Sequence, residues 1–156
     1  MAAGSANNVV PRTFAVIALV LLLLGDPLAA AELRVEIGGL RNAEGKIRVA
    51  LFRTPGDFAK KEGVFLEEVV LATFPDAVLL FTDVPPGTYG LAAFHDENAD
   101  GKFARGLLGI PREGYGFGND APVFFEAPAF EKAAVVVPTT GTKTTLTMRY
   151  WLERAD

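Results

Sequence analysis

The chain of 156 residues contains no cysteine, one histidine and one tryptophan. Without cysteine the protein has no disulfide bonds, no thiolate metal sites and no cysteine nucleophile. A single histidine, His95, also excludes zinc sites that are built from several histidines. The stability of a folded domain must therefore come from its hydrophobic core without help from covalent crosslinks.

The chain also lacks an excess of basic residues. Its 15 lysines and arginines are outnumbered by 19 aspartates and glutamates, which gives a net charge of −4. Binding to a phosphate backbone requires clustered lysine and arginine side chains. We therefore expect no nucleic acid among the partners of this protein.

No hydrophobic run is long enough to span a membrane, which takes about 20 apolar residues. The run at 14–24 has eleven residues, and it follows a basic residue, Arg12. Three alanines at 29–31 then place small side chains at positions −3 and −1 of a cleavage site. We predict that 1–31 is a cleaved secretory signal, with an uncleaved anchor as the alternative.

Removal of this signal leaves a single domain, 32–156, of 156 − 31 = 125 residues. A chain of this length can bury a substantial core. The signal contains one basic and one acidic residue, so its loss keeps the net charge at −4. No cysteine follows the apolar run, which excludes a lipid anchor, and no membrane span is left after cleavage. The protein is therefore expected to be secreted.

The domain is dominated by alternation of apolar and polar residues, which is typical of strands with one buried face. Turn residues rich in glycine and proline separate the alternating segments. The predicted strands are 33–37, 47–51, 76–82, 89–95, 133–137 and 142–152, with 64–74 ambiguous in period. About seven short strands without a convincing amphipathic helix predict an all-β fold. We expect a single antiparallel β-sandwich, immunoglobulin-like or prealbumin-like, with a mostly irregular region at 102–128.

The segment 95–103 carries the densest pattern of oxygen ligands in the chain. Asp96, Asn98 and Asp100 stand at alternate positions, and a glycine follows. They match positions 1, 3, 5 and 6 of an EF-hand-type calcium loop, in which the carbonyl of Lys102 would fill position 7. We therefore predict a weak calcium site at Asp96, Asn98, Asp100 and Lys102, and calcium is the one cofactor that the sequence indicates.

The calcium loop is incomplete in this chain. Position 12, where a glutamate normally closes the coordination shell, is Leu107. Glu97, Glu113, Asn119, Asp120 or water would have to supply the missing oxygens. The alternative is a solvated turn held by side-chain hydrogen bonds, which needs no metal.

His95 falls on the same face of its strand as Tyr89 and Leu91, which predicts a hydrogen-bonded residue at the end of a strand. The alternative is a general base beside Asp96 or Glu97. Because neighbouring residues of a strand point to opposite faces, Asp96 is poorly placed to orient His95.

The segment 114–119 alternates glycine with aromatic residues. No strand-to-helix context surrounds it, so a phosphate-binding loop is not expected. We predict that Tyr115 and Phe117 pack under the preceding loop, while the glycines allow tight bends. The alternative is a platform on which a ligand stacks, with Trp151 as a partner.

Six short motifs carry a family resemblance. They are GKIRVALF at 45–52, PGTY at 86–89, HDEN at 95–98, GK at 101–102, LGIPREGYGF at 108–117 and PAFEKA at 128–133. Together they resemble a bacterial family known as domain of unknown function 2141. This resemblance implies a secreted, mostly periplasmic domain with no assigned activity. The family pattern has an acidic residue at the position after Phe103, whereas this chain has Ala104 there. A possible fourth oxygen ligand is therefore missing.

The step PPGTY at 85–89 is similar to transthyretin-like and carboxypeptidase-regulatory-like sandwiches. This short motif agrees with the predicted sandwich but names no ligand.

These observations favour a non-catalytic binding or accessory module whose partner is a protein, a peptide or a carbohydrate. One rival is a small hydrolase that uses His95 with a nearby carboxylate, or a pair among Glu97, Asp100 and Glu113 for glycoside hydrolysis. Another is a structural protein of the cell envelope that has no small-molecule ligand.

Overall fold

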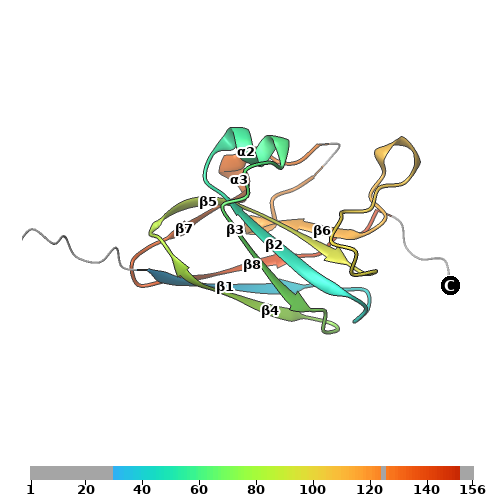
Figure 1. The fold of residues 1–156 in the computed structure, drawn as a ribbon, viewed down its shortest axis with the longest axis horizontal. Helices are drawn as coiled ribbons and strands as arrows, with labels where there is room; N and C mark the ends of the chain where they lie inside the picture. The colour runs from blue at the N-terminus through green and yellow to red at the C-terminus, as the bar shows by residue number, and fades with distance from the viewer. Residues whose placement is uncertain (1–29, 124–125, 152–156) are drawn as a thin grey trace, which may run out of the picture.

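The computed structural model describes 30–123 and 126–151, and this part of the chain is mostly β (Figure 1). Two short α-helices and two 3-10 turns accompany the strands. In chain order the elements are β1 (Ala31–Gly38), β2 (Lys46–Phe52), α2 (Pro55–Lys60), β3 (Leu66–Leu71), β4 (Ala77–Val84), β5 (Gly87–Asp96), η1 (Leu107–Gly109), β6 (Gly114–Phe117), η2 (Gly118–Asp120), α3 (Phe130–Ala133), β7 (Ala134–Val137) and β8 (Thr142–Thr147). The expectation of an all-β fold is confirmed.

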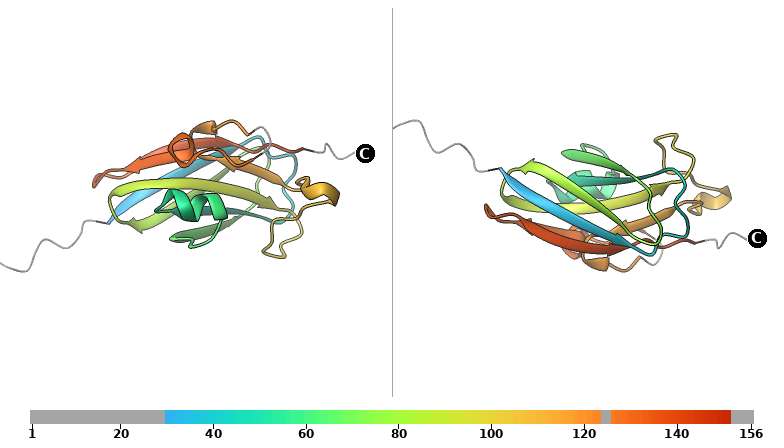
Figure 2. Two further views of the ribbon diagram at one scale, coloured as in Figure 1. Left: turned by 90° about the horizontal axis from the view of Figure 1, so that it is seen from above. Right: turned by 90° about the horizontal axis from the view of Figure 1, so that it is seen from below.

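The strands form two sheets. The three-stranded sheet has the order β4-β1-β8, and the five-stranded sheet has the order β3-β2-β5-β6, with β7 also paired to β5. Figure 2 shows the described chain entering and leaving at opposite ends of the molecule. The loop that joins β5 to β6 lies at the same end as the last described residues.

The predicted antiparallel pairing is wrong for one pair of strands. β1 and β8 run parallel, from Leu33 opposite Thr142 to Gly38 opposite Thr147. Parallel neighbours need a long crossover connection, and here the whole of the intervening chain provides it. The other strand pairs in the described ranges are antiparallel.

The described strands number eight, where about seven were predicted. The additional strand, β6, lies inside 102–128, where its glycines weaken the strand signal. β8 ends at Thr147, earlier than the predicted 142–152, and residue 152 lies outside the described residues. The predicted signal, 1–31, also lies outside them except for its last two residues.

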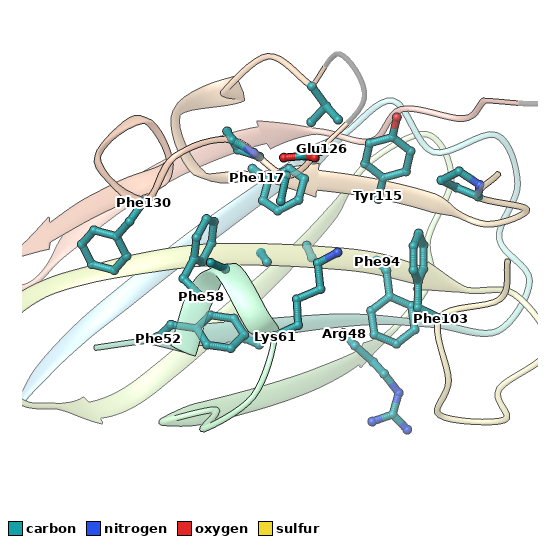
Figure 3. A pocket seen from close by; sticks show the side chains of 18 of the residues that line it. Arg48, Phe52, Phe58, Lys61, Phe94, Phe103, Tyr115, Phe117, Glu126 and Phe130 are labelled. Atoms are coloured by element: carbon teal, nitrogen blue, oxygen red, sulfur yellow. The ribbon is translucent and has the colours of Figure 1, made fainter. Parts of the chain in front are cut away.

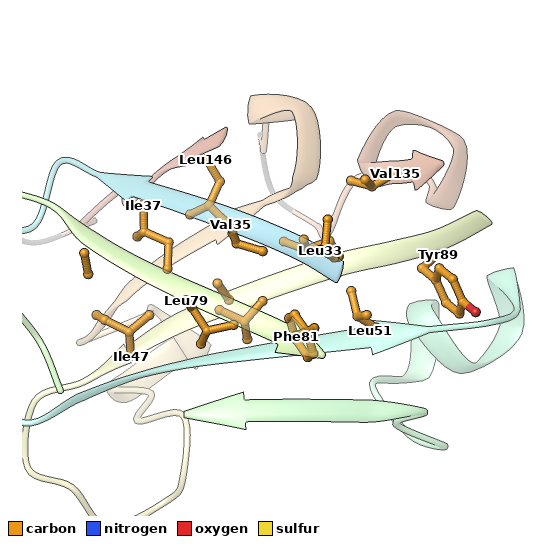
Figure 4. Packing of buried hydrophobic residues seen from close by; sticks show 14 of the residues in the cluster. Leu33, Val35, Ile37, Ile47, Leu51, Leu79, Phe81, Tyr89, Val135 and Leu146 are labelled. Carbon is orange, nitrogen blue, oxygen red and sulfur yellow. The ribbon is translucent and has the colours of Figure 1, made fainter. Parts of the chain in front are cut away.

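One hydrophobic core is shared by both sheets (Figure 4). Leu33, Val35 and Ile37 of β1 are at most 1% exposed, and they meet Ile47 and Leu51 of β2, which are fully buried. Burial of one such side chain stabilises the fold by about 1.5–3 kcal/mol. The apolar positions of the period-2 pattern are therefore the positions that hold the two sheets together.

A second apolar cluster lies on the other face of the five-stranded sheet. It contains Phe52 of β2, Phe58 of α2 and Phe117 of β6, together with two alanines. Figure 1 shows α2 and α3 above this face, on the side away from β1, β4 and β8. Both faces of the central strands β2 and β5 are therefore partly covered by apolar groups.

Local sequence explains why α2 forms where it does. The Thr54 side chain accepts a hydrogen bond from the Asp57 backbone N–H, which caps the first turn, and Pro55 takes the first helical position. The helix ends at Lys60, and the next residue, Lys61, caps it in a left-handed conformation with φ of 57°. This ending directs the Lys61 side chain toward the outer face of the sheet (Figure 3).

No helix in the described ranges is long and apolar enough to cross a membrane.

Candidate functional site

The turn after β5 is organised by the buried carboxylate of Asp96. Its Oδ1 accepts a hydrogen bond from the Asp100 backbone N–H at 3.0 Å, and its Oδ2 accepts one from Gly101 at 2.9 Å. Arg48 on β2 donates from Nε to the same Oδ2 at 3.0 Å. Asp96 is fully buried, so these three donors replace the water that its charge would otherwise require.

Asn98 and Asp100 continue the same arrangement. Asn98 Oδ1 accepts a second hydrogen bond from the Asp100 backbone N–H at 3.2 Å, and Asn98 Nδ2 donates to Asp100 Oδ2 at 3.0 Å. Asp100 Oδ1 accepts from the Lys102 backbone N–H at 2.8 Å. The side-chain oxygens of Asp96, Asn98 and Asp100 are therefore engaged with the backbone and with each other.

Among the described residues, no group of three or more His, Asp or Glu side chains is arranged to hold a metal ion. A calcium shell that uses asparagine and carbonyl oxygens stays a prediction. An ion at this turn would have to displace hydrogen bonds that already satisfy its ligands.

Glu97 joins this turn to the β1–β2 loop. Its carboxylate accepts hydrogen bonds from Arg41, including one from Nε at 2.8 Å, and one from Asn42 Nδ2 at 2.7 Å. Burial by itself would raise the pKa of Glu97, but the hydrogen bonds from Arg41 and Asn42 outweigh it, so the pKa is lowered. Glu97 therefore acts as an anchor of two loops.

Glu113 is 4% exposed and closes the other side of the loop system. Its Oε2 accepts a hydrogen bond from the Ala104 backbone N–H at 2.8 Å. Burial raises the pKa of Glu113, and the nearby charges of Asp96 and Asp100 raise it further. Asn119 is not part of this system, because its side chain donates to the Ala134 carbonyl at 2.7 Å.

His95 is buried in the core and both of its ring nitrogens have partners. Nε2 lies 2.6 Å from the Glu44 carbonyl, which can only accept, so in the neutral ring Nε2 carries the proton. Nδ1 then accepts from the Tyr150 hydroxyl at 2.7 Å, and that hydroxyl accepts from the Arg41 backbone N–H. This geometry agrees with the prediction of a hydrogen-bonded strand residue and provides no accessible base.

A groove of about 790 Å³ lies on the outer face of the five-stranded sheet (Figure 3). Its floor is a row of small side chains, since Ala50 on β2 stands directly opposite Ala92 on β5. This volume is within the range of pockets that hold small molecules, about 300–1,000 Å³.

Aromatic side chains form two walls along this floor. On one side Phe94 contacts Phe103 edge to face, with ring centroids 5.6 Å apart, and Phe103 contacts Tyr115 at 6.2 Å. On the other side Phe58 is surrounded by further phenylalanines at 5.6–5.9 Å, namely Phe52, Phe117 and Phe130. Trp151, which is 52% exposed, also lines the groove.

The structure brings Tyr115, Phe117 and Trp151 to the same groove. Phe117 packs as predicted, with 8% of its surface exposed, whereas Tyr115 is only partly buried. This arrangement fits the alternative of a ligand-stacking surface as well as that of packing. The predicted packing under the preceding loop is also observed, through the contact between Tyr115 and Phe103.

The glycines between these aromatic residues have a different role from the predicted tight bends. A Cβ at Gly114 would lie 2.4 Å from the Tyr150 ring, and one at Gly116 would lie 2.8 Å from Leu146. β6 therefore passes close to β8 and the segment after it on one face. Its other face carries Tyr115 and Phe117 into the groove.

Three cationic side chains line the groove. Arg48 is neutralised by Asp96 and by Glu67, at 3.0 and 3.3 Å. Lys61 and Arg105 have no carboxylate within 4.0 Å in the part of the chain that the structure describes. Burial by neighbouring groups, followed by repulsion from Arg105, lowers the pKa of Lys61.

Sequence reasoning missed most of the groove. Phe58, Phe94, Phe103 and Phe130 are separated by up to 72 positions along the chain, and only the fold collects them. One signal was available in the strand pattern. On β5 the outward positions read Gly90, Ala92 and Phe94, which is an apolar face where a solvated one would be polar.

Comparison with known proteins identifies a family and no activity. A family model described as an uncharacterized protein conserved in bacteria (DUF2141) matches 35–146. No curated protein and no solved structure matches the chain. The family resemblance indicated by the sequence motifs is confirmed.

Proposed function

The chain belongs to this family of uncharacterised bacterial proteins, DUF2141, and we propose that it is a non-catalytic binding module that holds an apolar ligand in its aromatic groove. We further propose that its two sheets form a single β-sandwich of the immunoglobulin-like or prealbumin-like type. In this proposal the domain follows a cleaved signal and works in the periplasm.

The groove itself is the observation that carries this proposal. A sheet face that only meets solvent would present polar side chains, whereas this face presents two alanines between two walls of aromatic rings. The aromatic rings are held by edge-to-face contacts with one another, so the walls keep their shape without a ligand. A preformed apolar cavity of this kind is the usual form of a small-molecule site.

The geometry argues against the rival of a small hydrolase. His95 is fully buried and lies on the core face, on the opposite side of the sheet from the groove. The carboxylates of Asp96, Glu97 and Glu113 accept hydrogen bonds from the protein itself. A general base needs reach to a substrate proton, which this His95 does not have.

Trp151 provides a direct test, because it is the only tryptophan and it lines the groove. We expect an uncharged apolar compound such as decan-1-ol to change Trp151 emission in a saturable manner. Ala92→Phe fills the floor of the groove and should abolish this response. Ala43→Phe, the same substitution in the exposed β1–β2 loop, should leave it unchanged.

Circular dichroism of both variants would show that they fold. A response that survives Ala92→Phe in a folded protein would contradict the proposal, as would the absence of any saturable response in the unsubstituted protein. The latter result would favour the rival of a structural envelope protein.

A further inference from the structure

We propose that the ligand of the groove is an amphipathic anion, a free molecule with an apolar body and one anionic headgroup beside Lys61 and Arg105. This inference rests on the proposed function, since it names the class of ligand for the same groove.

Lys61 points into the groove. Figure 3 shows its ammonium group reaching into the groove between Phe58 and Phe94. The guanidinium group of Arg48 is turned away from the aromatic rings in the same view. Lys61 therefore brings a charge into a region whose other nearby surfaces are mostly apolar.

Two cations of the groove have no counter-charge in the part of the chain that the structure describes. Within the described ranges, neither Lys61 nor Arg105 has a carboxylate within 4.0 Å, although the chain as a whole carries a net charge of −4. Arg105 lies over the Phe103 ring, with 5.2 Å between its Cζ and the ring centroid. This contact holds the guanidinium group at the aromatic wall without neutralising it.

Arg105 also acts on the charge of Lys61. Lys61 is solvent-exposed as a residue, but desolvation by the groups around its side chain and the proximity of Arg105 both lower its pKa, so each disfavours its charged form. The negative charge of a ligand anion would favour the charged form of Lys61 and offset the repulsion from Arg105, whereas a cation would add to that repulsion. The charges of Lys61 and Arg105 therefore favour an anionic ligand at this end of the groove.

Glu126 opposes this preference. It lines the groove, and Figure 3 shows its carboxylate beside Phe117 on the wall opposite Lys61. A headgroup is therefore expected at the Lys61 side, with the apolar body along the alanine floor. Glu126 also provides a test of opposite sign, because its neutralisation should strengthen the binding of an anion.

The test compares three compounds with the same ten-carbon chain: decanoate, decan-1-ol and decyltrimethylammonium. Titrations followed by Trp151 emission at pH 7, below the micelle concentrations, should place decanoate first. We expect it to bind about three- to ten-fold more tightly than decan-1-ol, with the cation weakest.

Variants assign the preference to the groove. Lys61→Gln should weaken decanoate binding by about three- to ten-fold and change decan-1-ol binding by a smaller factor. Lys60→Gln is the matched control, since Lys60 is the last residue of the helix that Lys61 caps and does not line the groove. Glu126→Gln should strengthen decanoate binding more than decan-1-ol binding.

The outcomes separate this inference from the proposed function. The anion inference is wrong if decanoate binds no more tightly than decan-1-ol, or if Lys61→Gln and Lys60→Gln change the affinity for decanoate equally. The proposal of an apolar groove would survive either result. If none of the three compounds binds, the proposed function fails with it. Sedimentation of the protein with phosphatidylglycerol vesicles that Lys61→Gln abolishes would show a membrane headgroup as the source of the anion and overturn the claim of a free molecule.

Discussion

Single residues in the 95–119 region hold the backbone in place. His95 completes a hydrogen-bonded chain from the Arg41 N–H through the Tyr150 hydroxyl to its own ring and on to the Glu44 carbonyl. This chain satisfies polar groups that the core would otherwise bury without partners. His95, a candidate general base from the sequence, is therefore part of a hydrogen-bonded network in the fold.

Two glutamates in this region should give opposite dependences on pH. The pKa of Glu97 is lowered in the folded protein, so its stabilising effect is present above its unfolded pKa of about 4.3 and is lost as pH falls. Glu97→Gln should therefore cost about 1–3 kcal/mol of unfolding free energy at pH 7, and this loss should shrink toward pH 3.

The pKa of Glu113 is raised, so its contribution is fully present below the unfolded pKa and is lost as pH rises through the folded pKa. Glu113→Gln keeps an acceptor for the Ala104 N–H but cannot ionise. The free energy of unfolding of this variant, relative to that of the unsubstituted protein, should therefore be higher at pH 7 than at pH 3. Urea unfolding at both pH values measures the two effects, and parallel pH slopes for the two variants would contradict this account.

At the scale of elements, the turn after β5 and the strand β6 explain most of the sequence signals. The alternate oxygens of 96, 98 and 100 bind backbone N–H groups of the same turn. The alternate glycines of β6 permit close packing on β8 and its continuation. Only the pattern of β6 reflects the two faces of an extended strand. The alternate oxygens belong to a turn in which Ala99 and Gly101 have positive φ.

The turn supplies a prediction about calcium. Because its carboxylate oxygens already accept backbone hydrogen bonds, we expect the same melting temperature in calcium and in chelator. Asp96→Ala should lower stability by about 2–4 kcal/mol in both conditions, since it leaves buried donors without a partner. A calcium-dependent rise in melting temperature that Asp100→Ala removes would instead establish the predicted calcium site.

At the scale of the whole molecule, the five-stranded sheet separates two apolar regions. Its inner face contributes to the core shared with β1, β4 and β8, and its outer face forms the groove. The two regions have different physical roles, because the core is fully packed whereas the groove keeps open volume.

This separation can be tested with two phenylalanines. Phe81 lies in the shared core and is 1% exposed. Phe81→Ala should lower the free energy of unfolding by about 3–5 kcal/mol. Phe94→Ala, on the groove wall, should cost less than half as much and weaken decan-1-ol binding instead. Thermal unfolding and Trp151 titration of both variants measure the two effects. Equal losses of stability would show that the groove wall is part of the core.

The sequence by itself determined the all-β class, the inward residues of the main strands and the hydrogen-bonded character of His95. These follow from alternation along one strand, which is a local property. It also predicted the family, through motifs such as HDEN at 95–98.

Only the tertiary structure decided the parallel pairing of β1 with β8 and the existence of the groove. Both depend on which strands become neighbours, since the groove collects side chains from β2, α2, β5, β6 and the loops between them. No pattern within one segment records where another segment will lie. For that reason the apolar outer face of β5 was visible in the sequence, but the walls that turn it into a groove were not.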